Sequence, residues 1–239
     1  MKVPAKKISR PLEAKGPLRR KILLVDDHPF MRAGLAQLIE LQPDMTVAGE
    51  AGNPAEALQK FTASKPDMVL TDMTMPGRSG LEFIKDLRAI EPEIAILVIS
   101  MHDEAIYAER ALRAGARGYI MKEAGGENLL AAIRQVLSGQ VYLSPRMSAK
   151  AFDRFSGRRP RGSSSPIEKL TDREFEVFRL VGQGKSTRDI AQELHLSTKT
   201  VDVHRAHIKE KLELKDVTAL VRHAVRWVET QNLGQGSAG

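Results

Sequence analysis

The sequence predicts a two-domain protein: a doubly wound α/β domain built on a five-stranded parallel sheet, followed by an all-α domain of four helices. Two observations predict this fold class. Between residues 21 and 140, short apolar runs alternate with helical patterns of ten or more residues, which is typical of a parallel sheet covered on both faces. After Pro166 the periodicity is helical throughout. Residues 141–165 lie between the two parts, are rich in Pro, Gly, Ser and Arg, and are expected to form a basic flexible linker.

Five β-α units are expected in the first domain. Strands are expected at residues 22–25, 46–51, 68–71, 95–100 and 118–121, and helices at residues 30–41, from 54, 81–90, 104–114 and 127–137. The second helix has the clearest start, because Asn53 can cap it and Pro54 fits its first position. In the usual strand order of such sheets, 2-1-3-4-5, ligands bind at the carboxyl ends of the strands.

Caps and glycines divide the second domain, residues 166–230, into four short helices. Thr171 and Glu174 have the spacing of a capping box. A short helix at 187–194, a tight turn and a longer helix at 197–212 form the pattern of a helix-turn-helix. A fourth helix from Asp216 carries an apolar stripe on one face. The stripe consists of Val217, Leu220, Val221, Ala224, Val225 and Val228.

The net charge of +7 is distributed unevenly along the chain. Residues 1–20 hold seven basic residues and one acidic residue, and residues 144–165 hold six and one. Residues 21–143 hold twelve and seventeen, and residues 166–239 hold twelve and eleven. The surplus of base therefore lies in the linker and in residues 1–20, which we expect to be a disordered arm. A disordered tail is also expected at residues 231–239.

Composition excludes several classes of protein. The apolar content of 42% excludes a wholly disordered chain, and the absence of Cys excludes a disulfide scaffold and thiolate metal sites. No run approaches the roughly 20 apolar residues of a membrane helix. A cytoplasmic protein without a membrane partner is therefore expected.

Three carboxylates are expected to meet at one crevice of the sheet. Asp26 and Asp27 directly follow the first strand, and Asp72 directly follows the third, which is its neighbour in the usual strand order. Such a cluster repels itself unless a cation neutralises it, and Mg²⁺ suits carboxylate oxygens. Each acid alone also fits a helix cap or an exposed position. His28 precedes Pro29 and is expected to lead into a helix rather than to bind a metal.

Two further polar residues end strands at the same rim. Ser100 ends the fourth strand and Lys122 follows the fifth. A Lys there supplies a positive charge for a phosphoryl group, and a Ser can hydrogen-bond to one of its oxygens. The five polar groups together therefore predict a phosphoryl site.

Four separated motifs resemble the receiver domain of two-component response regulators. They are Leu-Val-Asp-Asp-His at 24–28, Val-Leu-Thr-Asp-Met-Thr-Met-Pro-Gly at 69–77, Ile-Ser-Met-His at 99–102 and Gly-Tyr-Ile-Met-Lys at 118–122. The resemblance covers residues 21–140. It implies that Asp72 accepts a phosphoryl group from a sensor histidine kinase, and it also implies roles for the residues around Asp72. Mg²⁺ would be held by Asp26, Asp27, Asp72 and the backbone carbonyl of Thr74, Lys122 would pair with the phosphate, and Ser100 and Tyr119 would be the switch residues.

The resemblance also implies how the switch works. A carboxylate can attack a phosphoryl group in line, with Mg²⁺ and Lys122 neutralising its charge. Phosphate contacts would then draw Ser100 inward and open a space for Tyr119. Glu123 stands where many receivers have Pro, so no cis peptide bond is implied. Thr74 and His102 occupy positions thought to tune the lifetime of the phosphate, which stays open.

The second domain resembles the LuxR-type helix-turn-helix. The resemblance is carried by residues 170–174, 184–191 and 196–212, and with the receiver it gives the architecture of the NarL/FixJ group of transcription regulators. It implies that residues 197–212 include the recognition helix. Base contacts are then expected from Lys199, Asp202, Val203 and Ala206, and phosphate contacts from Thr200, Arg205 and Lys209. Asp202 stands where many relatives have Lys and can accept from a cytosine amino group.

We therefore expect a DNA-binding transcriptional response regulator that catalyses only its own phosphorylation and dephosphorylation. Its expected partners are double-stranded DNA, a sensor histidine kinase and, once phosphorylated, a second copy of the chain, with RNA polymerase as a further candidate. Val217, Val221 and Val225 are the expected dimer contact.

Two alternatives stay open on the sequence. A Mg²⁺-dependent phosphohydrolase would need a second acid where Thr74 stands. In the other alternative, a DNA-binding protein uses its receiver only for dimerisation. The helical bundle itself also fits a dimerisation module.

Overall fold

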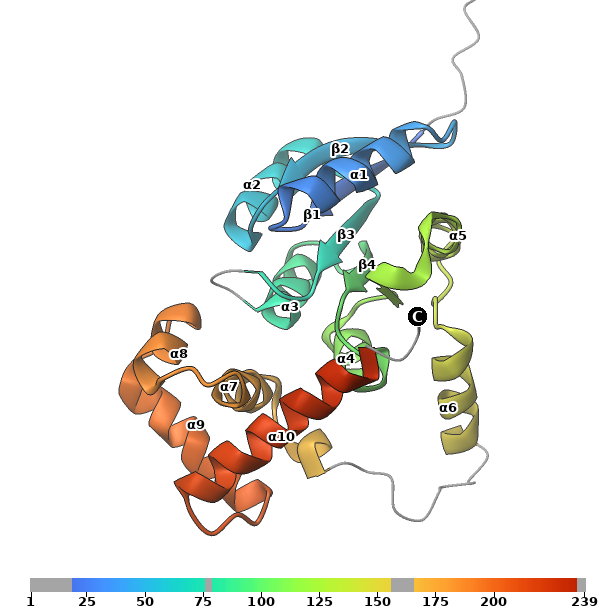
Figure 1. The fold of residues 1–239 in the computed structure, drawn as a ribbon. Coiled ribbons are helices and arrows are strands. Elements are labelled where there is room, and N and C mark those ends of the chain that lie inside the picture. Colours follow the sequence, from blue (N-terminus) through green and yellow to red (C-terminus); the bar gives the residue numbers. More distant parts are fainter. Residues whose placement is uncertain (1–18, 76–78, 156–165, 236–239) are drawn as a thin grey trace, which may run out of the picture.

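The computed structural model describes residues 19–75, 79–155 and 166–235 and contains the two expected domains (Figure 1). The rest of the expected arm and tail, residues 1–18 and 236–239, lies outside the described residues.

The first domain is a five-stranded parallel sheet in the predicted order β2-β1-β3-β4-β5. Its strands are β1 (Arg20–Val25), β2 (Met45–Ala51), β3 (Met68–Asp72), β4 (Ala95–Ser100) and β5 (Gly118–Met121). Its helices are α1 (Pro29–Glu40), α2 (Pro54–Ser64), α3 (Gly80–Ile90), α4 (Glu104–Ala114) and α5 (Gly126–Leu137). The predicted cap of α2 is confirmed, because the Asn53 side chain accepts a hydrogen bond from the Glu56 N–H.

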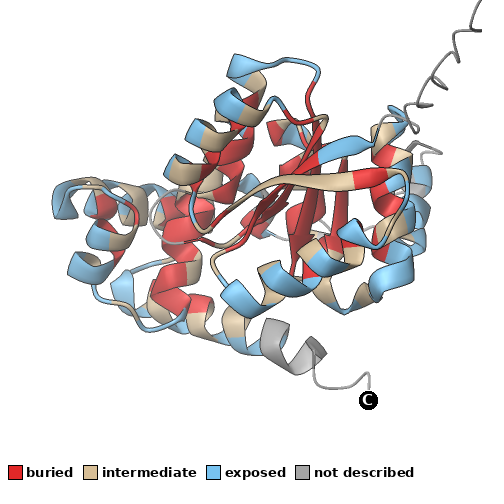
Figure 2. Cartoon of the chain, turned by 90° about the horizontal axis from the view of Figure 1, so that it is seen from above, coloured by how far each residue is buried: buried red, intermediate tan, exposed pale blue. Residues whose placement is uncertain are grey.

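Helices cover both faces of the sheet, and β3 and β4 are buried along their whole length, whereas the edge strand β2 is mostly half-buried (Figure 2). Alternate residues of β1 point to opposite faces. Leu23 and Val25 pack with residues of α2, α3 and α4, whereas Ile22 and Leu24 pack with residues of α1 and α5. This is why β3 and β4 are largely continuous apolar runs rather than alternating ones.

The second domain consists of four helices after a short 3₁₀ turn, η2 (Pro166–Lys169): α7 (Asp172–Gly182), α8 (Thr187–Glu193), α9 (Thr198–Lys211) and α10 (Val217–Gln235). The capping box of α7 is confirmed, with the Thr171 side chain and the Glu174 carboxylate each bonding to the other's backbone N–H. Helix α10 crosses α7 closely at Gly182, where an added Cβ would lie 2.4 Å from the Ala224 carbonyl oxygen. The helical domain lies beside the α3 and α4 side of the first domain (Figure 1).

The linker differs from its prediction. Helix α6 (Pro145–Phe155) occupies a large part of the segment expected to be flexible. Its start has a physical reason: the Ser144 hydroxyl accepts from the Met147 N–H, and Pro145 occupies the first position. Residues 156–165 lie outside the described residues.

Both predicted chain boundaries also shift. Arg20 belongs to β1 rather than to the arm, and the Arg19 guanidinium donates to the backbone carbonyls of Met45, Glu40 and Gln42. The two arginines therefore belong to the sheet edge and to the end of α1. At the other terminus α10 continues to Gln235, five residues beyond the predicted domain end at 230, because no helix breaker occurs before Gly234.

Candidate functional site

The predicted carboxylate cluster forms at the carboxyl end of the sheet. Val25 of β1 pairs with Thr71 of β3, so the residues that follow them, Asp26 and Asp72, emerge side by side. Both are buried, at 1% and 4% exposure. Lys122, directly after β5, reaches across β4 and its Nζ lies 2.7 Å from a carboxylate oxygen of each.

One ammonium shared by two buried carboxylates leaves the pocket short of positive charge. Burial raises the pKa of Asp72 above its ordinary value, and the hydrogen bond from Lys122 only partly opposes this. Burial alone would lower the pKa of Lys122, but its hydrogen bonds to Asp26 and Asp72 outweigh burial and raise it. Lys122 therefore stays charged between the two carboxylates that it binds.

The residues present fit a divalent cation. Ligand atoms of Asp26, Asp27, His28 and Asp72 lie within 4.8 Å of one another. Among the described residues, Asp27 Oδ1 is buried and accepts no hydrogen bond, although His28 Nδ1 lies 3.0 Å away. Three carboxylates against one ammonium leave two negative charges, which a divalent ion would neutralise. His28 is the residue before α1, as predicted, and its backbone N–H donates to Asp26 Oδ1 over 2.8 Å.

The two predicted switch residues, Ser100 and Tyr119, lie beside this pocket, and both are buried. Ser100 is fully buried at the end of β4. Tyr119 is already inside, at 1% exposure, and its hydroxyl donates to the His102 carbonyl oxygen over 2.7 Å. The movement of Tyr119 on phosphorylation stays a prediction.

Thr74 and His102 are brought together. The Thr74 Oγ1 and His102 Nε2 atoms are 2.6 Å apart. The Thr74 backbone N–H donates to Asp72 Oδ1 over 3.2 Å, which places this residue directly beside the Asp72 carboxylate. The described chain contains no cis peptide bond, in agreement with Glu123 in place of Pro.

Sequence reasoning missed the contact between the two domains. Arg110 of α4 donates to the backbone carbonyls of Ile167 and Leu170 over 2.9 Å each, and its guanidinium carbon lies 4.4 Å from the Phe175 ring centre. Asp172, at the start of α7, pairs with both Arg110 and Lys85. No local sequence pattern predicts such contacts, because Arg110, Asp172 and Lys85 are each an ordinary polar residue of their own helix.

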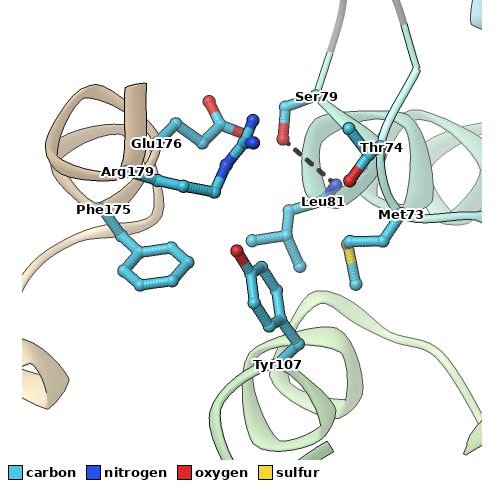
Figure 3. A pocket seen from close by; sticks show the side chains of 8 residues that line it. All are labelled: Met73, Thr74, Ser79, Leu81, Tyr107, Phe175, Glu176 and Arg179. Atoms are coloured by element: carbon cyan, nitrogen blue, oxygen red, sulfur yellow. Dashed lines mark hydrogen bonds between the residues drawn. The ribbon is translucent and has the colours of Figure 1, made fainter. Parts of the chain in front are cut away.

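A small pocket marks the centre of this contact (Figure 3). The α7 residues Phe175, Glu176 and Arg179 face the receiver's Tyr107, whose hydroxyl points into the space between them. Met73, Thr74, Ser79 and Leu81 complete the lining. Burial raises the pKa of Glu176, although a hydrogen bond with Ser79 of the receiver opposes this.

The helix-turn-helix presents the predicted face to solvent. Val201 and Ile208 of α9 are fully buried, and Leu212 is half-buried. The residues expected to contact bases are all exposed: Lys199, Asp202, Val203 and Ala206. The three expected phosphate contacts, Thr200, Arg205 and Lys209, are half-buried. Arg205 also donates to Thr187 Oγ1 of α8 over 2.6 Å, so it ties the two helices together.

The apolar stripe of α10 divides between the core and the surface. Leu220 and Ala224 are fully buried against the domain, whereas Val217 is 48% exposed and Val221 and Val225 are half-buried. Within the described residues, no helix is long and apolar enough to cross a membrane.

A doubly wound sheet with three carboxylates and a lysine at its carboxyl end, joined to an exposed recognition helix, defines the class of two-component transcriptional regulators. Comparison with known families agrees. Residues 22–134 match the response regulator receiver domain, and residues 168–224 match the luxR family of bacterial regulatory proteins. The chain belongs to the response regulators with a LuxR-type DNA-binding domain, and it is a two-component transcriptional regulator.

Individual relatives support this assignment along most of the chain. The oxygen regulatory protein NreC of Staphylococcus carnosus is 36% identical over 86% of this chain and 97% of its own length. A LuxR-family response regulator from Aurantimonas sp. is 36% identical, with a TM-score of 0.54, over 57% of this chain and 99% of that structure. RcsB of Salmonella enterica, solved bound to promoter rprA with the phosphomimetic BeF₃⁻, shares the fold at 22% identity, with a TM-score of 0.65 over 87% of this chain and 98% of its own.

Proposed function

We propose that a sensor histidine kinase phosphorylates this chain on Asp72 and that the carboxylate cluster binds Mg²⁺ for this reaction. The observation that carries the proposal is the buried pair of Asp72 and Lys122, 2.7 Å apart, beside an Asp27 oxygen without a hydrogen bond. Asp26, Asp27, Asp72 and the Thr74 carbonyl would hold the ion. When bound, Mg²⁺ neutralises the charge of the incoming phosphoryl oxygens.

The chain's own residues perform the remaining steps. A carboxylate oxygen of Asp72 attacks phosphorus in line, the bond from phosphorus to the donor's imidazole nitrogen breaks, and that nitrogen keeps the bonding pair. Lys122 then pairs with a phosphoryl oxygen, and the Ser100 hydroxyl donates to another. The chain in this proposal catalyses only its own phosphorylation and dephosphorylation.

We also propose that α9 reads promoter DNA in the major groove. Lys199, Asp202, Val203 and Ala206 would face bases, and Thr200, Arg205 and Lys209 would face phosphates. Exposure of the first four residues supports this assignment. Two copies paired through the exposed part of α10 would occupy two half-sites, in the cytoplasm where the DNA lies, and would alter the access of RNA polymerase.

Acetyl phosphate tests the phosphoacceptor assignment. With Mg²⁺, the wild-type chain should form an acid-stable, base-labile acyl phosphate, which a gel that retards phosphoproteins measures. Asp72→Asn should form none, and the control Glu91→Gln, which changes an exposed acid, should match the wild type. An equal yield in Asp72→Asn would refute the assignment, and multiple turnovers on phosphate esters would favour a phosphohydrolase.

A further inference from the structure

His102 lies between the phosphoacceptor site and the DNA-binding domain. On one side, its backbone N–H donates to Ser100 Oγ over 3.1 Å and its ring nitrogen lies 2.6 Å from Thr74 Oγ1. The Tyr119 hydroxyl holds its carbonyl oxygen. Three residues that border the phosphoryl site therefore hold this one residue, through its N–H, its carbonyl and its ring.

The other side of the His102 ring faces the second domain through a series of aromatic contacts. The ring stacks on Tyr107 of α4 with centroids 4.8 Å apart and planes at 21°. Tyr107 meets Phe175 of α7 edge to face at 5.1 Å, and Phe175 meets Trp227 of α10 at 5.5 Å. The series therefore continues from the rim of the phosphoryl site into the core of the DNA-binding domain.

We propose that His102 is the positioning residue that couples the phosphoacceptor site to docking of the DNA-binding domain. The proposal rests on phosphorylation of Asp72. Tyr119 is buried beside His102, and its hydroxyl donates to the His102 carbonyl oxygen. The part that can move is the segment from Ser100 to His102. When the Ser100 hydroxyl turns toward a phosphoryl oxygen, it draws this segment toward the site and pulls the His102 ring away from Tyr107, which loosens α7.

The Arg110 contacts hold the docked state independently of His102. The Arg110 side chain is only 11% exposed, and it binds two backbone carbonyls, a carboxylate and an aromatic face of the other domain. Its removal should undock the domain without touching the phosphoryl site. Coupling between two binding equilibria is reciprocal. If phosphorylation loosens docking, docking must weaken binding at the phosphoryl site by the same factor.

The experiment uses the full chain with Mg²⁺ and beryllofluoride. ¹⁹F NMR measures beryllofluoride affinity, and hydrogen exchange of residues 167–176 measures docking. In the wild type, beryllofluoride should speed exchange of this segment about fivefold or more. In His102→Ala, exchange should be the same with and without beryllofluoride, while beryllofluoride still binds. Arg110→Ala should bind beryllofluoride about fivefold more tightly.

Two controls accompany these variants. Arg113→Ala lies on the same helix, 74% exposed and paired with Glu109, and should match the wild type in both measurements. Tyr107→Phe keeps the stacked ring and removes a hydroxyl that has no hydrogen-bond partner, so its coupling should also stay intact.

The outcomes separate this inference from the function on which it rests. A wild type that binds no beryllofluoride would refute the phosphoacceptor site itself. Binding without any change in exchange of residues 167–176 would leave that site intact and overturn the coupling. A His102→Ala variant that couples normally or loses beryllofluoride binding, or an Arg110→Ala variant with wild-type affinity, would also overturn it.

Discussion

At the scale of single residues, the environment of Asp72 is determined by the Lys122 ammonium, which Asp72 shares with Asp26. Lys122 satisfies both Asp72 and Asp26 at 2.7 Å, and Asp27 contributes a third carboxylate to the same pocket. Like charges that are buried together destabilise a fold. Removal of the Lys122 ammonium would leave the Asp26 and Asp72 carboxylates unpaired. A divalent cation should therefore stabilise the receiver as well as serve its chemistry.

Mg²⁺ is expected to raise the thermal unfolding midpoint of the receiver domain. An ion that binds only the folded state at 100 times its Kd adds about 2.7 kcal/mol to the free energy of unfolding. Asp27→Asn should lose most of this shift, because it removes the carboxylate whose oxygen has no hydrogen bond. Scanning calorimetry with and without Mg²⁺ measures both, and Glu91→Gln, which changes an exposed acid, is the control. An equal shift in Asp27→Asn would place the ion elsewhere.

Glu174 should make the stability of the DNA-binding domain depend on pH. Burial opposes ionisation of this carboxyl, but its hydrogen bonds with Lys211 and Thr171 outweigh burial and lower its pKa from the ordinary value of 4.5. The stabilisation is therefore present above pH 4.5 and is lost as the pH falls through the lowered pKa. Urea unfolding followed by fluorescence of Trp227, the only Trp in the chain, reports on this domain because that ring packs against Phe175 and Phe178.

Substitution isolates the contribution of Glu174. In Glu174→Gln the free energy of unfolding should fall at pH 7, and the difference from the wild type should shrink as the pH falls below 4.5. Glu229→Gln, which changes an exposed acid on α10, should unfold as the wild type does at both pH values. A difference between Glu174→Gln and wild type that is independent of pH would show that the carboxylate charge is not what stabilises the domain.

At the scale of elements, the crossing of α7 and α10 depends on one missing side chain. An added Cβ at Gly182 would lie 2.4 Å from the Ala224 carbonyl oxygen and 2.6 Å from the Val228 side chain. Because a backbone atom cannot turn away, Gly182→Ala must separate the two helices. We expect a loss of about 1–3 kcal/mol of unfolding free energy, measured by urea unfolding with Trp227 fluorescence.

Gly34 is the matched control for Gly182→Ala. It lies within α1, and nothing lies within 4 Å of the Cβ that Ala would add. Gly34→Ala should therefore stabilise the receiver by about 0.5–1 kcal/mol through helix propensity, measured by circular dichroism. If Gly182→Ala proved as stable as the wild type, close contact at this crossing would not limit the packing of the domain.

Elements were predictable where a local signal marks them. The strands, the caps at Asn53 and Thr171 and the carboxylates that end β1 and β3 all carry such a signal, and the structure places them as predicted. Helix α6 was missed because basic, Pro- and Gly-containing composition outweighed the Ser144-Pro145 start signal. The inward position of Tyr119 and the contacts of Arg110 were not predictable, since they depend on packing between segments far apart in the sequence.

At the scale of the whole molecule, docking does not cover the surface expected to read DNA. The base-facing residues of α9 are exposed, and α9 lies on the side of its domain away from the receiver sheet (Figure 1). The receiver instead contacts α7 through α3 and α4. Docking therefore restricts how the DNA-binding domain is oriented rather than blocking its recognition helix. We therefore expect DNA binding to be controlled through the pairing of two DNA-binding domains, one from each copy of the chain, on two half-sites.

The charge distribution gives a prediction for the intact chain on DNA. Both domains are acidic or nearly neutral, whereas residues 1–18 hold five basic residues and one acidic residue. A deletion should stop at residue 18, because Arg19 and Arg20 belong to the receiver fold. If the arm binds DNA phosphates, the deletion should reduce the slope of log affinity against log salt by up to about 0.9 for each phosphate that the arm neutralises.

Fluorescence anisotropy with a nonspecific DNA duplex at several salt concentrations measures that slope. A full-length variant separates charge from length by replacing the arm's basic residues with Gln: Lys2, Lys6, Lys7, Arg10 and Lys15. Because counterion release depends on charge, this variant should bind with the same reduced slope as the deletion. A wild-type slope in both proteins would show that the arm neutralises no phosphates, and the affinity for DNA would then have to come from the helical domain and the linker.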